Sequence, residues 1–214
     1  MKVAVLFSGG KDSVFAAFCC LFSGWEPILL TIEPEKHSTM FHHPNVKWCK
    51  NQAKAMKLPI VSIKADGKGE EKELLAMKNA LKKLKVQGVV SGAIESEYQK
   101  QRIGKVAHEL GITSFCPVWR TGKALLEEQC KYFETYLVSV AAQGLGKGML
   151  TKRFDADFVE KLGKLKPQVA KNLEGGEGET FVANAPFFKK RLKIKKWKTS
   201  FDGSQGAAEI SKLT

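Results

Sequence analysis

Two kinds of hydrophobic pattern alternate along the first half of the chain. Short apolar runs, which are typical of buried strands, occupy residues 3–7, 25–33, 58–63 and 87–91. The segments between them have apolar residues three and four positions apart, as amphipathic helices do; they start at residue 12 and include residues 45–57 and 69–85. Because parallel strands need long crossovers, this alternation predicts an α/β fold whose parallel sheet has helices on both faces.

The pattern changes near Trp119. Beyond it we expect a helix at residues 124–132, a strand-like apolar run at residues 133–142 and a charged helix at residues 155–165. These mixed elements do not continue the regular alternation of the first half. The sequence therefore predicts an N-terminal domain of residues 1–119 and a smaller α+β C-terminal domain of residues 120–214.

The first strand passes into the first helix through a short loop at residues 8–13, Ser-Gly-Gly-Lys-Asp-Ser. A strand that turns through two glycines into a helix leaves backbone N–H groups pointing at open space, and the helix dipole favours an anion there. Hydroxyl and ammonium side chains add further donors. We therefore expect a phosphate chain to bind Ser8, Gly9, Gly10, Lys11 and Ser13.

Asp12 stands in the same loop, where a carboxylate beside phosphates is favourable if a cation lies between them. Magnesium is the usual cation in such sites, so we expect Asp12 to hold Mg²⁺. The loop is not a Walker A motif, which has four residues between its first glycine and its Gly-Lys pair. The alternative is a plain turn in which Asp12 or Ser8 caps the helix N-terminus.

A second loop, Ser91-Gly92-Ala93, follows the fourth predicted strand. Ligands of parallel sheets bind beyond the carboxyl ends of the strands, so both loops should lie at one site, where Gly92 lets a ligand approach the backbone. The next helix carries a polar stripe at spacings of three and four, and its first turn should line the site. This stripe, which is otherwise a solvated face, consists of Glu95, Tyr98, Gln99 and Arg102.

Residues 174–181, Glu-Gly-Gly-Glu-Gly-Glu-Thr-Phe, combine three glutamates with three glycines. This composition suits neither a helix nor a strand. The stretch is therefore either an acidic surface turn or a place where carboxylates hold a cation or accept a proton near a substrate.

Composition narrows the class of protein. No apolar run approaches the roughly 18 residues that cross a bilayer, and the N-terminus leads directly into the first strand. We therefore expect a soluble, cytoplasmic protein with no membrane contact. The five cysteines include no Cys-x-x-Cys pair, which disfavours a disulfide framework or a structural zinc site.

The net charge is +13, and seven basic residues with no acidic one lie between Phe187 and Phe201. Such a run could hold RNA phosphates or an acidic partner protein. Apolar residues interrupt it, however, as they would in a solvated edge strand, which we favour over nucleic-acid binding.

Three histidines, His37, His42 and His43, cluster in a polar segment at residues 35–44. No cysteine or carboxylate stands at ligand spacing from them, so we interpret the segment as a loop rather than a metal site.

The motifs resemble those of a known family. The SGGKDS loop is similar to the pyrophosphate loop of the ATP pyrophosphatase (PP-loop) superfamily, which splits ATP into AMP and pyrophosphate. The stretches GAIESEYQKQR from residue 92, LGITSFCPVW from residue 110 and EGGEGETFVANAPFF from residue 174 resemble the archaeal diphthine–ammonia ligase family. One departure is Gly178, where that family's pattern has a bulky residue. The resemblance covers almost the whole chain and implies a Rossmann-like fold of the adenine nucleotide alpha hydrolase type.

The resemblance also implies an activity and its site residues. ATP with Mg²⁺ would adenylate the carboxylate of diphthine on elongation factor 2, and ammonium would then supply the amide nitrogen of diphthamide. The residues implied for ATP are Ser8, Gly9, Gly10, Lys11, Asp12, Ser13 and Gly92. Those implied for the substrate are Glu95, Tyr98, Gln99, Arg102 and Glu174. The implied catalytic groups are Lys11, Asp12 and, for the ammonium proton, Glu177 or Glu179.

Two other functions stay open at this point. One is another PP-loop enzyme acting on tRNA or on a small-molecule carboxylate, and the other is a non-catalytic module that binds adenine nucleotides. A homodimer is also left open.

Overall fold

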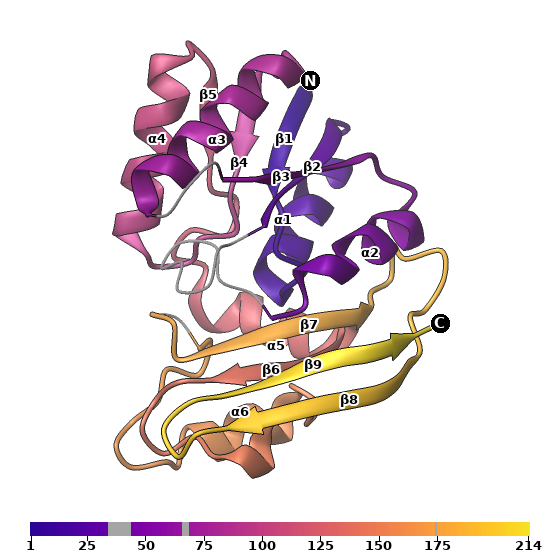
Figure 1. Ribbon diagram of the computed structural model, residues 1–214, viewed down its shortest axis with the longest axis vertical. Coiled ribbons are helices and arrows are strands. Elements are labelled where there is room, and N and C mark those ends of the chain that lie inside the picture. Colours follow the sequence, from indigo (N-terminus) through magenta and orange to yellow (C-terminus); the bar gives the residue numbers. More distant parts are fainter. Residues whose placement is uncertain (34–43, 66–68, 174) are drawn as a thin grey trace.

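The computed structural model describes residues 1–33, 44–65, 69–173 and 175–214, and within these ranges the chain forms two sheets (Figure 1). A five-stranded parallel sheet has the strand order β3-β2-β1-β4-β5, and a four-stranded antiparallel sheet has the order β7-β6-β9-β8. The predicted fold class, a parallel sheet with helices on both faces and a smaller α+β part, is confirmed.

Strands and helices alternate through the first half as the hydrophobic pattern predicts. The strands are β1 (Lys2–Leu6), β2 (Glu26–Glu33), β3 (Ile60–Lys64), β4 (Gly88–Val90) and β5 (Thr113–Phe115). The helical elements are α1 (Lys11–Phe22), the 3₁₀ turn η1 (Val46–Trp48), α2 (Cys49–Met56), α3 (Glu70–Leu84) and α4 (Glu97–Glu109). The elements from β1 to β4 lie within a few residues of the segments that predict them.

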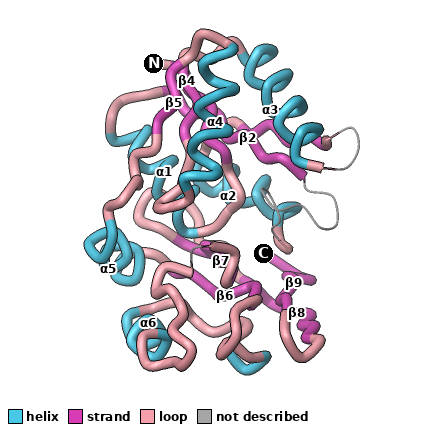
Figure 2. The backbone as a smooth tube through the Cα atoms, turned by 90° about the vertical axis from the view of Figure 1, so that its left-hand side faces the viewer, coloured by secondary structure: helices cyan, strands magenta, loops and turns pink. Residues whose placement is uncertain are grey.

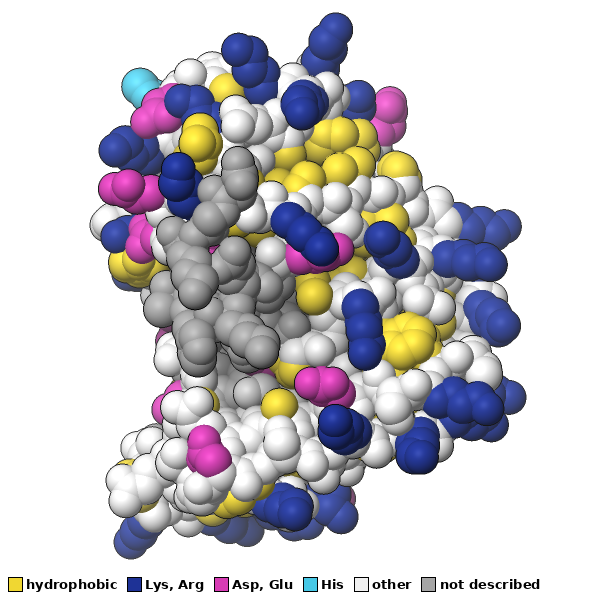
Figure 3. All heavy atoms as spheres, viewed as in Figure 1, with side chains coloured by type: hydrophobic (Ala, Val, Ile, Leu, Met, Phe, Trp, Pro, Cys, Tyr) yellow, Lys and Arg dark blue, Asp and Glu magenta, His cyan; other side chains and the backbone are white. Residues whose placement is uncertain are grey.

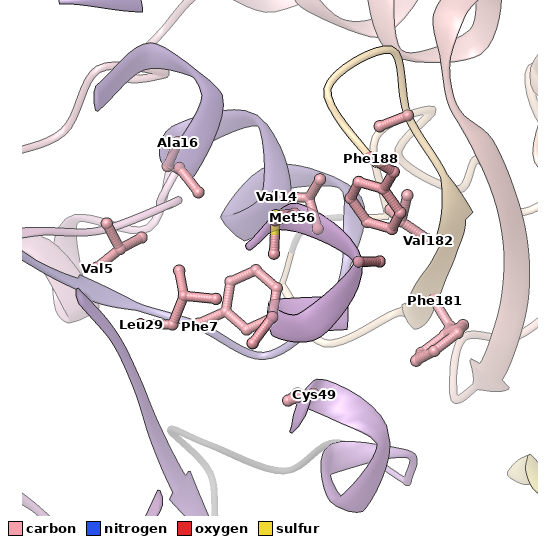
Figure 4. Close-up of a cluster of buried hydrophobic side chains, with 14 of the residues drawn as sticks. Val5, Phe7, Val14, Ala16, Leu29, Cys49, Met56, Phe181, Val182 and Phe188 are labelled. Atoms are coloured by element: carbon pink, nitrogen blue, oxygen red, sulfur yellow. The ribbon is translucent and has the colours of Figure 1, made fainter. Parts of the chain in front are cut away.

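Alternate residues of the central strand face opposite helical layers. In β1, Val3 and Val5 pack in the layer that contains α1 and α2, whereas Ala4 and Leu6 pack in the layer that contains α3 and α4. Figure 4 shows the first layer, where Phe181 and its neighbours in β7 join side chains from the parallel sheet. Because successive side chains point to opposite faces, a strand that is buried on both faces is a continuous apolar run.

The second half combines short helices with the antiparallel sheet. Its helical elements are α5 (Gly122–Tyr132), η2 (Lys147–Met149) and α6 (Ala156–Leu162). Its strands are β6 (Glu134–Val140), β7 (Gly178–Asn184), β8 (Ile194–Phe201) and β9 (Gly206–Leu213). Helix α6 begins after Asp155, whose carboxylate accepts a hydrogen bond from the Phe158 N–H at 3.0 Å, and it ends at Leu162 rather than at residue 165.

Strand β7 corrects one expectation about the glutamate-rich stretch. Residues 174–181 were expected to be neither helix nor strand, but β7 begins at Gly178, and Glu179 pairs with Ser139 of β6. Local propensity misleads here because strand pairing with β6 supplies the missing stabilisation. A Cβ at Gly178 would lie 2.8 Å from the Ser139 carbonyl oxygen, so this backbone has no room for a bulky residue at that position.

The basic run ends in an edge strand, as predicted. Strand β8 is the outermost strand of the antiparallel sheet, and the residues before Ile194 form the connection from β7. Irregular register with β9 leaves Lys195 and Lys196 both exposed, while Ile194 and Trp197 are partly buried. The apolar interruptions of the run are therefore the positions that contact the core.

Arg191 anchors the connection that leads into β8. Its guanidinium binds the carboxylate of Glu134 through two contacts, Nε to Oε2 at 2.6 Å and the terminal nitrogen to Oε1 at 2.7 Å. Burial alone would raise the pKa of Glu134, but hydrogen bonds from Arg191 and Tyr136 outweigh it and hold the pKa below its ordinary value of 4.5.

All five cysteines are free thiols. Cys20 and Cys49 are buried, and burial raises the pKa of each to about 12, so both are neutral at pH 7. In the part of the chain that the structure describes, every helix is too short or too polar to cross a bilayer.

We expect Arg191→Met to lower the thermal unfolding midpoint at pH 7, because it leaves the Glu134 carboxylate without its cation. A carboxyl with a lowered folded pKa stabilises the fold above its unfolded pKa, and this stabilisation is lost as the pH falls through the folded pKa. The difference from wild type should therefore shrink below about pH 4. Lys190→Met, which removes an adjacent unpaired charge, is the control. Equal midpoints for wild type and Arg191→Met at pH 7 would refute the anchoring role.

Candidate active site

A cavity of about 980 Å³ lies where the two sheets meet. Its walls include the loops after β1 and β4, the start of α4, and parts of β6 and β7. Figures 1 and 2 show β7 as the strand of the antiparallel sheet that lies nearest to the parallel half. Strand β1 lies between β2 and β4, so the cavity sits where the order of the parallel strands reverses, which is the usual ligand site of such sheets.

The loop after β1 presents backbone donors to this cavity. Helix α1 begins at Lys11 with Gly10 as its N-cap and no capping side chain, so neither Asp12 nor Ser8 caps it. Within the described ranges, the backbone N–H groups of Gly9, Asp12 and Ser13 have no hydrogen-bond partner. Asp12 and Ser13 line the cavity, whereas Gly9 is buried and does not. Unpaired N–H groups at a helix N-terminus form an anion site.

Two hydroxyls flank these donors. The Oγ atoms of Ser8 and Ser13 lie 3.3 Å apart, and both residues line the cavity. Ser13 Oγ donates a hydrogen bond to the Gly10 carbonyl oxygen at 3.0 Å, which orients the hydroxyl within the loop. The predicted phosphate-binding loop is thus assembled from main-chain and hydroxyl groups.

The ammonium of Lys11 is bound by the neighbouring carboxylate of Asp12. Lys11 is only 2% exposed, and its Nζ lies 2.6 Å from Asp12 Oδ2 and over the ring of Phe154. The other oxygen of Asp12 accepts a hydrogen bond from Gln129 Nε2 at 2.8 Å. Lys11 also lines the cavity, and its predicted contact with a phosphate stays a prediction.

Asp12 fits the magnesium role predicted for it. Its side chain is 24% exposed and lines the cavity. No cluster of three or more histidine, cysteine or acidic side chains able to hold a metal occurs among the residues described. Mg²⁺ commonly binds one or two protein carboxylates and takes its remaining ligands from phosphates and water, so Asp12 suits a magnesium ion that arrives with a nucleotide.

The second half of the chain holds the loop in place. The Gly9 carbonyl oxygen accepts hydrogen bonds from Gln52 Nε2 at 2.9 Å and from the Val182 N–H at 3.1 Å. Thr180 Oγ1 accepts one from the Lys11 N–H at 3.1 Å. Gln52 is fully buried and also donates to the Val182 carbonyl oxygen at 2.8 Å. Strand β7 and helix α2 thus fix the shape of the loop.

Sequence reasoning missed three of these residues: Gln52, Gln129 and Thr180. One signal was available for Gln52, which lies three residues after Cys49 and four before Met56 on the buried side of its helix. A polar side chain on such a face needs buried partners. No spacing in the sequence marks Gln129 or Thr180.

The close approach at Gly92 involves protein backbone. A Cβ at this position would lie 2.8 Å from the Ser13 nitrogen and from the Asp12 carbonyl carbon. Gly92 also lines the cavity, but its lack of a side chain is required by contact with the first turn of α1. Gly92 therefore lets the two loops pack together, and the ligand approach expected at this residue stays a prediction.

The four residues of the polar stripe predicted on α4 do not all lie at the cavity. Tyr98 and Gln99 line the cavity. Arg102 lies over the Tyr98 ring, 3.3 Å from its centroid, and both side chains bind the carboxylate of Glu70. Glu95 precedes the helix, because Ser96 caps it, and is exposed outside the cavity. Glu95 therefore does not share a helix face with the others.

The two described glutamates of the acidic stretch face different surroundings. Glu179 lines the cavity from β7. Glu177 does not; its Oε2 accepts a hydrogen bond from the Ala170 N–H at 2.7 Å and so ties down a neighbouring loop. Glu174, His37, His42 and His43 lie outside the described residues.

Comparisons with known proteins agree with this architecture. Residues 1–114 match the family model described as diphthamide synthase N-terminal domain, and residues 121–214 match the one described as diphthamide synthase C-terminal domain. A diphthine–ammonia ligase from Danio rerio is 29% identical over 239 residues, which cover 100% of this chain and 94% of that protein. The one from Homo sapiens is 28% identical over 225 residues, with 90% and 82% covered.

A solved structure shares the fold. It is described as a predicted subunit of tRNA methyltransferase from Methanocaldococcus jannaschii DSM, and it matches with a TM-score of 0.52. The match covers 87% of this chain and 98% of that chain at 18% sequence identity. At that identity the likeness concerns the fold alone.

The loop geometry predicts the effect of a methyl group at Gly9. Gly9 and Gly24 both have positive φ angles, of +82° and +70°, so alanine is strained at either position. A Cβ at Gly9 would also overlap the buried Gln52 amide, whereas one at Gly24 meets open space. We expect Gly24→Ala to cost about 1 kcal/mol of unfolding free energy and Gly9→Ala about 3 kcal/mol.

Urea unfolding measures these costs, and calorimetric titration with ATP should show lost binding for Gly9→Ala alone. Equal costs and equal ATP affinities for the two variants would contradict the packing described around Gly9.

Proposed function

The chain belongs to the diphthamide synthase family, whose matched members are named ligases, and we propose that it amidates diphthine on elongation factor 2 with ammonia at the expense of ATP. The observation that carries this proposal is a cavity lined on one side by Asp12 and Ser13, whose N–H groups have no partner in the described structure, and on another side by the carboxylate residue Glu179. One wall suits phosphates, and the other suits an ammonium ion.

In this proposal the N-terminal domain of residues 1–119 binds the nucleotide, and the C-terminal domain of residues 120–214 contributes to the substrate site. The N–H groups of Asp12 and Ser13 and the hydroxyl of Ser8 hold the phosphates of ATP. Asp12, fixed by Lys11, is the ligand for Mg²⁺, which when bound offsets the charge of the leaving pyrophosphate.

The cavity is large enough for the two ligands that the proposed reaction requires. Its volume of about 980 Å³ is at the upper end of the roughly 300–1,000 Å³ that small-molecule pockets occupy. The cavity reaches from the loop after β1 to the β8–β9 turn, where Gln205 lines it. Such a space accommodates a nucleotide together with a modified side chain from a protein substrate.

The proposed chemistry has two steps. A carboxylate oxygen of diphthine attacks the α-phosphorus of ATP, and the bond to the β-phosphate oxygen breaks to release pyrophosphate. Ammonia then attacks the carbonyl carbon of the acyl-adenylate, and the carbon–oxygen bond to AMP breaks. The products are diphthamide, AMP and pyrophosphate.

Residues on the second wall have roles in positioning and proton transfer. We assign the proton released when ammonium becomes the nucleophile to the Glu179 carboxylate, because it faces the cavity. Tyr98 and Gln99 contact the diphthine side chain, and Arg102 positions Tyr98 by lying over its ring. Glu177 has no catalytic role in this scheme, since its carboxylate binds backbone outside the cavity.

The function is tested by measuring AMP and pyrophosphate with ATP, Mg²⁺, ammonium and diphthine-bearing elongation factor 2, omitting one component at a time. We expect AMP only when all are present, with the product detected by mass spectrometry as the amide. AMP that forms without the factor, or with tRNA in its place, would point to another PP-loop enzyme. Nucleotide binding without any pyrophosphate release would indicate a non-catalytic module.

Glu179 and Glu177, two residues apart in the chain, allow a matched test of which carboxylate accepts the proton. We expect Glu179→Gln to lower the rate of amide formation by about 100-fold, the usual size of a general-base contribution, with adenylation retained. Glu177→Gln, the same change two residues earlier, should reduce the rate by less than about threefold. Equal losses in the two variants would remove Glu179 from the mechanism.

A further inference from the structure

A face rich in exposed lysines lies away from the cavity. Helix α2 and turn η1 present four exposed lysines: Lys47, Lys50, Lys54 and Lys57. The β7–β8 connection and strand β8 present six more: Lys189, Lys190, Lys193, Lys195, Lys196 and Lys198. We call these ten residues the lysine face.

Hydrogen bonds join the two parts of the lysine face into one surface. The Lys189 N–H donates to the Ala55 carbonyl oxygen of α2 at 2.7 Å, and Trp48 Nε1 donates to the Ile210 carbonyl oxygen of β9 at 2.9 Å. Figure 3 shows dark-blue side chains gathered along the right-hand side of the molecule, the side on which Figure 1 places α2 and the C-terminus. Segments far apart in the sequence therefore contribute to one positive patch.

The chain offsets little of the charge on the lysine face. In the β8–β9 ladder, Lys198 lies opposite the carboxylate residue Glu209. Within the described ranges, none of its lysines forms an ion pair, whereas Arg191, in the middle of the basic run, is paired with Glu134. Lys196 even lies opposite Lys212 in the β8–β9 ladder, a placement of like charges that destabilises a sheet. Protection of an edge strand accounts for lysines on β8 but not for those on α2.

We propose that the lysine face binds the phosphate backbone of a structured RNA. Lysines that contact phosphates release counterions, and this release by itself provides sequence-independent affinity for nucleic acid. Nothing else is needed on the protein side except an accessible row of cations, which the face provides.

The composition of the face favours RNA over an acidic protein. Protein interfaces depend on buried aromatic and arginine anchors and are depleted in lysine. Among the described residues, the exposed large hydrophobic side chains are Met1, Phe22, Leu75, Tyr98 and Tyr132, and none of them lies in α2, the β7–β8 connection or β8. The rings of Trp48, Phe187 and Trp197, in or next to these elements, are partly buried against the core, which disfavours stacking on unpaired bases and leaves contacts with the backbone of a helical RNA.

The lysine face is separate from the site of the proposed reaction. None of its ten lysines lines the cavity between the sheets. Substitutions on the lysine face should therefore change RNA binding without changing AMP formation with the protein substrate. The two activities are measured separately, so failure of the RNA proposal can be distinguished from failure of the proposed function.

The test compares two triple substitutions that remove the same charge from the full chain. One is K195Q/K196Q/K198Q on the lysine face, and its matched control is K82Q/K83Q/K85Q at the end of α3, where the lysines are also exposed and unpaired in the described structure. Binding to an RNA duplex of about 20 base pairs is measured by fluorescence anisotropy between about 50 and 200 mM salt. Competition with polyglutamate tests an acidic protein as the partner.

We expect the triple substitution on the face to weaken duplex binding roughly tenfold or more and to reduce the salt slope by about 2 to 3, while the control changes affinity less than about twofold. The thermal midpoint of the triple variant on the lysine face should change little, because the relieved Lys196–Lys212 repulsion offsets the lost Lys198–Glu209 attraction. Equal losses of RNA affinity in the two variants would show that only the net charge of the protein matters, and this would overturn the proposal. It is also overturned if wild type does not bind the duplex near physiological salt, or if polyglutamate binds more tightly than RNA.

Discussion

The carbonyl oxygen of Gly9 is the group on which the site most depends. It accepts hydrogen bonds from the buried Gln52 side chain and from the backbone of Val182, so one atom joins the loop after β1 to both α2 and β7. Gly9 itself has a positive φ angle, which only glycine adopts without strain. The conformation that turns the neighbouring N–H groups toward the cavity is thus held by partners outside the loop.

This constraint makes the two halves of the chain one functional unit. Helix α1 belongs to the first half of the chain, but two of its groups bind residues of the second half. The Lys11 N–H donates to Thr180, and the Asp12 carboxylate accepts a hydrogen bond from Gln129. The hydrophobic layer between α1 and α2 continues into β7, where Phe181 and Val182 are fully buried. The family models match the halves separately, yet the cavity exists only between them.

The charged residues around the cavity and those on the lysine face differ in how they are paired. Around the cavity, each charged group with a described partner is held in place by it: Asp12 by Lys11, and Arg102 by Glu70. Buried or partly buried ions need such partners, since desolvation is costly. On the opposite side of α2 and along β8 the lysines are exposed and unpaired in the described ranges, which water permits at little cost. A site for small ligands and a surface for a large polyanion are therefore built from different kinds of electrostatics.

The sequence alone determined the parallel sheet, the strand–loop–helix at residues 3–22 and the edge strand in the basic run. These features follow from local periodicity and from the rule that ligands bind at the carboxyl ends of parallel strands. Only the tertiary structure decided that Lys11 binds Asp12, that Gly92 packs on α1, and that Glu179 rather than Glu177 faces the cavity. Each of these outcomes depends on contacts or strand register between residues far apart in the chain, and neither composition nor spacing specifies such pairing.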